Sequence, residues 1–400
     1  MAAARGMLDE HHQPLQQDPG DENNYTLGGI GVHNVVLACL PYGVTGLTSA
    51  AAVAMQMRSS FKCLRFSLMV GIGGGVPSRE NDIRLGDVVV SKPTEQSGGV
   101  IQYDFGKTVQ EGRFKLTGSL NRPPDVLLAA LASLQAKHLM EDGELSRFLS
   151  EMLKKYPNMR TLFAHPGTQH DQLYEAEYDH QGDDATCLQC DDMRLVHRER
   201  RMSKDPVVHY GLIASGNRVM RHGSTRDRLR KEQEVLCFEM EAAGLMDRFP
   251  CLVIRGICDY ADSHKNKRWQ PYAAATAAAY AKELLCFIPG NQAMSARTPF
   301  DVTEVDSSTS EMLAGPNGAY RHDFDYIDPG MTFASAGFSN YSSAIARDLQ
   351  LSQRSRATAA GRVRIATTSG FIGSRKAVNN GPFCMLSTST IPSVGFFVSC

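Results

Sequence analysis

The most informative segment of the chain is residues 235–262, VLCFEMEAAGLMDRFPCLVIRGICDYAD. Its first half predicts a short helix over 242–249, and Glu241 lies at the start of that helix, where unpaired N–H groups favour an ionised carboxylate. Its second half is an apolar run, 251–258, which is typical of a buried strand. Asp259 ends this strand, and we expect burial to raise the pKa of its carboxyl group. One ionised acid beside one protonable acid is the pattern of a substrate holder and a proton donor.

The overall composition is that of a folded protein. The chain has 400 residues and an apolar fraction of 42%, which is enough for one large domain or two ordinary domains with full cores. The formal net charge is −1, and no basic block stands out, so we do not expect nucleic acid as a partner. Residues 194–204 are locally basic, and we interpret them as a solvated loop.

The cysteines indicate the cellular environment. The ten cysteines are scattered, and several lie inside apolar runs. This distribution is typical of small core residues in a reducing compartment rather than of a disulfide framework. The N-terminus lacks the pattern of a signal peptide, and no apolar run reaches membrane-spanning length. We therefore expect an intracellular, cytoplasmic protein that does not bind membranes.

Alternating strands and helices predict one α/β domain over residues 25–290, preceded by a remnant helix and loop over 1–24. The predicted strands are 25–30, 33–40, 66–70, 85–91, 100–105, 113–117, 207–214 and 251–258. We expect 25–30 and 33–40 to form a hairpin around Gly31 and Val32, and 100–105 to pair with 113–117. The predicted helices are 50–58, 124–138, 145–156, 242–249 and 272–287. Residues 140–206 are charged and weakly periodic, and we interpret them as an insertion with long loops. Residues 291–400 are rich in Ser, Thr and Gly, and we expect them to be largely disordered.

Glycines follow the predicted strand 66–70 at once, in the run 71–75. Glycine at the end of a strand lets the backbone approach a ligand closely, and ligands gather at the carboxyl ends of strands in α/β sheets. The run is neither a Walker loop nor a full dinucleotide fingerprint. A tight structural turn explains it as well as a ligand loop does. Residues 215–217 and Asp259 occupy similar positions after other strands.

Each acidic residue also has a simpler explanation. Glu239 and Glu241 are two residues apart and do not share a helix face, so either one alone fits a solvated helix start. Asp259 fits a strand-end residue that caps the next turn, and Asp262 fits a loop cap.

Cys187 and Cys190 have the spacing of half a zinc site, with His180 and Asp191 nearby. The second half is missing from the expected spacing, although other histidines are available. A loop without metal is the better interpretation, and we predict no metal in the functional site.

Several short motifs, taken in order along residues 25–289, resemble the purine and uridine phosphorylase superfamily. The motifs are Val70-Gly-Ile-Gly-Gly-Gly75, Gly86-Asp-Val-Val-Val-Ser91, Phe238-Glu-Met-Glu-Ala242 and Arg255-Gly-Ile-Cys-Asp259. The chain is especially similar to nucleosidases that cleave methylthioadenosine and S-adenosylhomocysteine, and to the nucleoside phosphorylase-like N-terminal domains of fungal multidomain proteins. The resemblance implies a three-layer α/β/α fold with a mixed, partly barrel-like central sheet, and a homo-oligomer.

The resemblance also implies roles for individual residues. Asp259 matches the acid that protonates the purine at N7, and Glu241, with Met240, matches the residue that holds the ribose hydroxyls. Further substrate-binding positions are Glu239, Gly71, Gly73, Gly74, Ser215, Gly216, Asn217 and Val219. Breaking an N-glycosidic bond makes an oxocarbenium-like sugar, which a carboxylate stabilises while an acid neutralises the leaving base.

The implied partner is a small purine nucleoside, with no cofactor and with phosphate as the co-substrate if the reaction is phosphorolysis. Two features depart from the family pattern. Members of this type open with a buried strand and an Ala-Leu-Pro-x-Glu segment, whose Glu activates water, whereas this chain begins at Met1-Ala2-Ala3-Ala4. The arginines that bind phosphate cannot be assigned; Arg79 and Arg84 are only nearby in sequence. The alternative to an enzyme is therefore a nucleoside-binding or signalling module with impaired catalysis, a truncated relative of a fungal NLR-like receptor.

Overall fold

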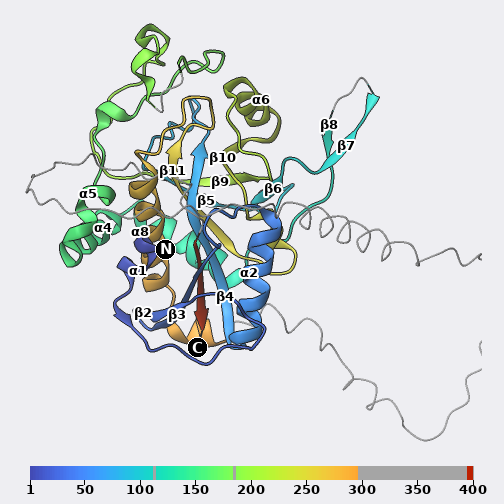
Figure 1. Ribbon diagram of the computed structural model, residues 1–400, viewed down its shortest axis with the longest axis vertical. Coiled ribbons are helices and arrows are strands. Elements are labelled where there is room, and N and C mark those ends of the chain that lie inside the picture. Colours follow the sequence, from blue (N-terminus) through green and yellow to red (C-terminus); the bar gives the residue numbers. More distant parts are fainter. Residues whose placement is uncertain (111–113, 183–185, 296–393, 400) are drawn as a thin grey trace, which may run out of the picture. The chain divides into compact units, whose positions relative to one another are not determined.

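The structure is a computed structural model that describes residues 1–110, 114–182, 186–295 and 394–399 (Figure 1). The strands are β1 (Glu10–His11), β2 (Thr26–Ile30), β3 (His33–Cys39), β4 (Leu64–Gly75), β5 (Val88–Ser91), β6 (Val100–Gln102), β7 (Gly106–Thr108), β8 (Phe114–Leu116), β9 (Val208–Ser215), β10 (Val235–Glu239), β11 (Leu252–Asp259) and β12 (Val394–Ser399). The helices are α1 (Ala2–Met7), α2 (Leu47–Ser60), α3 (Asp125–His138), α4 (Leu145–Lys155), α5 (Arg160–Phe163), α6 (Gly223–Gln233), α7 (Ala243–Met246), α8 (Gln270–Phe287) and α9 (Gly290–Ser295). Within these ranges, no helix has both the length and the apolar character needed to cross a membrane.

The central sheet is mixed, and its strand order among the described residues is β1-β2-β3-β12-β4-β10-β9-β5-β11. β11 also pairs in parallel with β4, so β4, β10, β9, β5 and β11 close into a barrel. β10 runs parallel to β9 and antiparallel to β4. Helices α8, α1 and α4 lie on one side of the sheet and α2 on the other (Figure 1). This arrangement is the predicted three-layer α/β/α fold with a mixed, partly barrel-like sheet.

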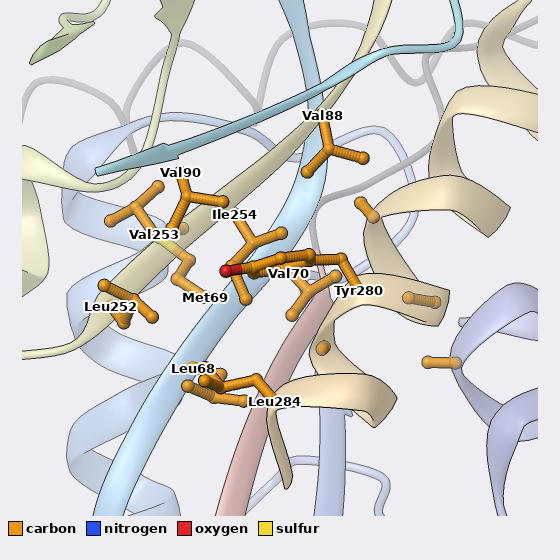
Figure 2. Packing of buried hydrophobic residues seen from close by; sticks show 14 of the residues in the cluster. Leu68, Met69, Val70, Val88, Val90, Leu252, Val253, Ile254, Tyr280 and Leu284 are labelled. Atoms are coloured by element: carbon orange, nitrogen blue, oxygen red, sulfur yellow. The ribbon is translucent and has the colours of Figure 1, made fainter. Parts of the chain in front are cut away.

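The hydrophobic core lies between the barrel strands and α8. Figure 2 shows side chains of three strands and the helix meeting there: Leu68, Met69, Val70, Val88, Val90, Leu252, Val253, Ile254, Tyr280 and Leu284. Helix α8 comes so close to β11 that a Cβ at Gly256 would lie 1.8 Å from the carbonyl oxygen of Ala273. Glycine is therefore required at this crossing, and the close packing holds the carboxyl end of β11 in place.

Several local predictions hold and others are wrong. The hairpin around Gly31 is present as β2 and β3, with Gly31 at a φ of 56°. Helix α2 begins at Leu47, not at residue 50, because the side chain of Asn217 accepts the Leu47 N–H at 3.1 Å. The predicted pairing of 100–105 with 113–117 is wrong, since β6 pairs with β9, and β8 pairs with β7.

The described residues outside the main α/β pattern form further helices and strands. Residues 1–24 contain α1, which is buried, and β1, which extends the sheet next to β2. The predicted insertion, 140–206, contains α4, α5 and single helical turns joined by loops. The predicted disorder of 291–400 falls mainly outside the described residues. Within that range, the structure describes the end of α9 and the strand β12, which lies antiparallel between β3 and β4.

Candidate active site

A cavity of about 480 Å³ opens where β4, β10 and β11 end. It brings together most of the residues that the sequence selected: Gly73, Gly74, Val219, Glu239, Met240, Glu241 and Asp259. Glu241, two residues beyond β10, and Asp259, at the end of β11, therefore line one cavity. The volume lies within the range of ordinary small-molecule sites, about 300–1,000 Å³.

Asp259 ends β11, and its carboxylate is almost fully enclosed. Oδ1 accepts the N–H of Ala261 at 2.9 Å and lies 2.9 Å from Nζ of Lys265, while the thiol of Cys258 lies 3.1 Å from Oδ2. Burial acts to raise the pKa of Asp259, but the ion pair with Lys265 and these hydrogen bonds outweigh it, and the pKa is lowered. The expectation of a raised pKa is therefore wrong, because the tertiary fold supplies a cation that the strand-end position does not reveal.

Lys265 is the partner that decides this ionisation. Burial acts to lower the pKa of its ammonium group, but the charge of Asp259 dominates and the pKa is raised. The two groups therefore form a charged pair at neutral pH on the wall of the cavity.

Glu239 and Glu241 share a buried guanidinium, that of Arg255. Arg255 is completely buried in β11, and its Nη2 pairs with Oε2 of Glu239 and lies 3.5 Å from Oε2 of Glu241. Glu239 also accepts the backbone N–H groups of Glu241 and Ala242, each at 3.0 Å. Glu239 therefore occupies the helix-start role that was expected of Glu241, and it supports the turn that carries Glu241. The helix itself, α7, begins at Ala243 and is shorter than predicted.

The glycine run is neither a tight turn nor a free loop, because β4 extends through Gly75. Gly73 and Gly74 pair with Ile257 and Asp259 of β11, and Gly74 also pairs with Phe238 of β10. A Cβ at Gly74 would lie 2.7 Å from Oδ1 of Asp259. The missing side chain therefore makes the space in which the Asp259 carboxylate sits.

The remaining predicted residues support the site from outside the described cavity wall. Ser215 is fully buried, and its Oγ accepts the N–H of Ala243 at 2.9 Å. The N–H of Gly216 donates to the carbonyl of Glu239 at 3.3 Å. Asn217 connects α2 to the carboxylate of Asp104, which accepts its N–H at 2.7 Å. Gly71 pairs with Arg255 within the sheet.

Five charged residues of the site were not predicted from the sequence. Four of them line the cavity: Lys265, Lys267, Arg218 and Arg221. The fifth, Arg255, pairs with the two glutamates. Arg255 had a detectable signal, since an arginine inside an apolar strand needs a buried carboxylate partner. Lys265 had none, because its position six residues beyond Asp259 predicts no contact.

Residues 8–285 match the Phosphorylase superfamily. This range includes the strands and helices that build the cavity. The chain belongs to the Phosphorylase superfamily. The match includes all four motifs on which the resemblance rests, so the resemblance is confirmed. In this superfamily member, the matched region runs from the end of α1 almost to the end of α8.

This member of the Phosphorylase superfamily is also similar to an individual fungal protein. The chain is 50% identical over 289 residues to a nucleotide-binding leucine-rich repeat (NLR)-like protein of Hyaloscypha variabilis, an alignment that covers 72% of this chain and 28% of the relative. This chain therefore spans little more than a quarter of that relative.

Solved structures give more distant matches. A putative 5′-methylthioadenosine/S-adenosylhomocysteine nucleosidase from Borrelia burgdorferi bound to adenine is 16% identical, with a TM-score of 0.44, over 71% of this chain and 95% of that one. Futalosine hydrolase of Helicobacter pylori is 16% identical, with a TM-score of 0.41, over 71% of this chain and 91% of that one.

Proposed function

We propose that this superfamily member binds a purine nucleoside in the cavity and cleaves its N-glycosidic bond. The observation that carries the proposal is the convergence of Glu241 and Asp259 on one cavity of about 480 Å³. Two carboxylates that line one small site suit a substrate that is a sugar at one end and a protonable base at the other.

Glu241 is the group that we assign to the sugar. Its carboxylate lies on the Arg255 guanidinium, while Glu239 is already committed to the backbone N–H groups of the turn. Hydrogen bonds from the ribose hydroxyls to Glu241 would orient the sugar and stabilise the positive charge that develops at its anomeric carbon.

Asp259 is the group that we assign to the base. As the bond between the anomeric carbon and the base nitrogen breaks, its electron pair moves to the purine, and a proton from Asp259 neutralises the base. Asp259 is ionised beside Lys265 in the free protein, so the reaction requires the less populated protonated form. Water or phosphate then supplies the oxygen that attacks the anomeric carbon.

Two arginines line the cavity in which a phosphate nucleophile would bind. Arg84 is an unsuitable phosphate ligand, because its guanidinium already binds Asp82 and the carbonyl of Glu199. Arg218 and Arg221 instead line the cavity itself. If the reaction is phosphorolysis, we propose these two residues as the phosphate ligands, since guanidinium groups bind phosphate through paired hydrogen bonds.

A second candidate function is nucleoside binding without turnover, in a signalling module. The observation that favours it is the Asp259–Lys265 ion pair, which lowers the pKa of Asp259 and so disfavours the proton donor that cleavage needs. The sequence relation to an NLR-like protein is compatible with this alternative.

One experiment separates the two functions. Adenosine, inosine and methylthioadenosine are each incubated with and without phosphate, and released base and sugar products are separated by chromatography. If the protein is an enzyme, the wild type should release the base, and Asp259→Asn should lose this release but still bind the nucleoside in calorimetry. If the protein is a binding module, the wild type should bind the nucleoside in calorimetry without releasing the base. Neither binding nor release with any nucleoside would overturn both functions.

We further propose that the protein is cytoplasmic and forms a homo-oligomer. Light scattering of the purified chain tests the second of these proposals.

A further inference from the structure

The insertion contains a second cluster of reactive side chains, separate from the cavity. The ligand atoms of His180, Cys187 and Cys190 lie within 4.8 Å of one another. Both thiols are half-buried, and neither forms a disulfide within the described part of the chain. Two cysteines with two residues between them, joined by a histidine, are three of the four ligands of a common structural zinc site.

A fourth residue, His264, comes from the loop that follows β11. Its ring centroid lies 5.6 Å from that of His180, and its ring stacks on Tyr174 at 4.1 Å. His264 is only 7% exposed, and neither of its ring nitrogens has a hydrogen-bond partner among the described residues. An imidazole buried without partners costs free energy, so a missing partner is the natural explanation.

We propose that His180, Cys187, Cys190 and His264 bind one zinc ion in a closed, tetrahedral structural site. The first three residues would not suffice without His264, because structural zinc sites take four protein ligands. Bond lengths of about 2.0–2.3 Å to zinc place tetrahedral ligand atoms about 3.3–3.8 Å apart. The ligand atoms of His180, Cys187 and Cys190, all within 4.8 Å of one another, lie near this spacing.

The surroundings of the cluster suit such a site. Nε2 of His180 lies 3.0 Å from the carbonyl of Thr186, a contact that leaves the lone pair on Nδ1 for a metal. Nδ1 of His264 lies 3.9 Å from Oδ1 of Asp262, which is beyond hydrogen-bond distance but places a carboxylate beside the ring.

The site would have a structural consequence for the cavity. His264 is followed directly by Lys265, whose ammonium pairs with Asp259. A metal bound to His264 would tie this loop to the insertion and so hold the cavity wall. This consequence is independent of whether the cavity cleaves or only binds a nucleoside.

The test measures metal in the full chain, produced without a polyhistidine tag. We expect about one zinc per chain by elemental mass spectrometry, and less than about a tenth of that in Cys187→Ser, Cys190→Ser and His264→Asn. The control is Cys63→Ser, which removes an exposed cysteine elsewhere and should keep its zinc.

A second measurement keeps the proposal testable if these variants fail to fold. Wild-type protein loaded with cobalt(II) should show thiolate-to-cobalt charge transfer and the intense visible bands of tetrahedral cobalt. Wild type without stoichiometric zinc after loading, octahedral cobalt spectra, or a Cys187–Cys190 disulfide in freshly isolated protein would each overturn the proposal. Full zinc retention in His264→Asn would overturn the assignment of the fourth ligand.

Discussion

Nζ of Lys265 lies 2.9 Å from Oδ1 of Asp259, on the wall of the cavity that also holds Glu241. Because of this contact, Asp259 is ionised in the free protein, although it is the strongest candidate for a proton donor. The pH dependence of any turnover therefore depends on a lysine that lies outside every recognised motif.

Replacing Lys265 with methionine should raise the pKa of Asp259, because burial would then act without the opposing cation. Each unit of rise increases the protonated fraction at neutral pH about tenfold. We therefore expect the alkaline limb of the kcat/KM profile for base release, where activity falls as Asp259 loses its proton, to move to higher pH, and activity at pH 7 to increase. Lys267→Met, which changes another lysine of the cavity wall, should leave the limb in place. Lower activity at every pH in Lys265→Met would show instead that Lys265 itself helps deliver the proton.

Loss of charge at Glu239 should mainly lower stability, whereas loss of charge at Glu241 should mainly lower activity. Glu239→Gln breaks a fully buried ion pair that also holds two backbone N–H groups, so we expect a loss of about 3–5 kcal/mol in unfolding free energy. Glu241→Gln leaves Arg255 paired with Glu239 and should be less destabilising, but should lower kcat/KM about 10²–10³-fold. Urea unfolding and steady-state kinetics on both variants provide the measurements. Equal stability losses with equal kinetic effects would contradict the separate roles.

Adding one methyl group at Gly74 should disable the site. The Cβ of Gly74→Ala would lie 2.7 Å from Oδ1 of Asp259 and 2.9 Å from Cβ of Ala261, so the carboxylate must move. We expect nucleoside binding to weaken at least about tenfold, since a displacement of this size disrupts site geometry. The matched control is Gly20→Ala, whose Cβ would come no closer than 3.4 Å to its nearest neighbour, Oδ1 of Asp18. Calorimetry that finds unchanged binding in Gly74→Ala would remove Asp259 from the binding site.

Asp87 should make stability depend on pH. Nη1 and Nη2 of Arg201 each lie 2.7 Å from its carboxylate, and Nε2 of His209 lies 3.0 Å away. Burial acts to raise the pKa of Asp87, but the bonds from His209 and Arg201 outweigh it, and the pKa is lowered. Its stabilising contribution is therefore present above the usual pKa of an aspartate, about 3.9, and is lost as the pH falls toward the lowered value.

Asp87→Asn should accordingly cost about 3–5 kcal/mol at pH 7, because it leaves Arg201 without its buried partner. The loss should shrink in acid, and thermal unfolding between pH 7 and pH 3 would show this convergence. The exposed pair of Arg122 and Asp125 supplies the control, and Asp125→Asn should change stability by less than about 0.5 kcal/mol. A pH-independent loss in Asp87→Asn would argue against an ionised Asp87.

The local sequence determined the α/β class, most strands and helices, the glycines of β4 and the two acids of the cavity. These features follow from hydrophobic periodicity, from the conformational freedom of glycine and from short motifs, all of which act between residues close in the chain. Only the tertiary structure decided the ionisation of Asp259, the pairing of Arg255 with both glutamates, and the position of His264 beside His180. A pKa or a ligand set depends on which charges and donors lie within a few ångströms, and the folded chain alone brings such distant groups together.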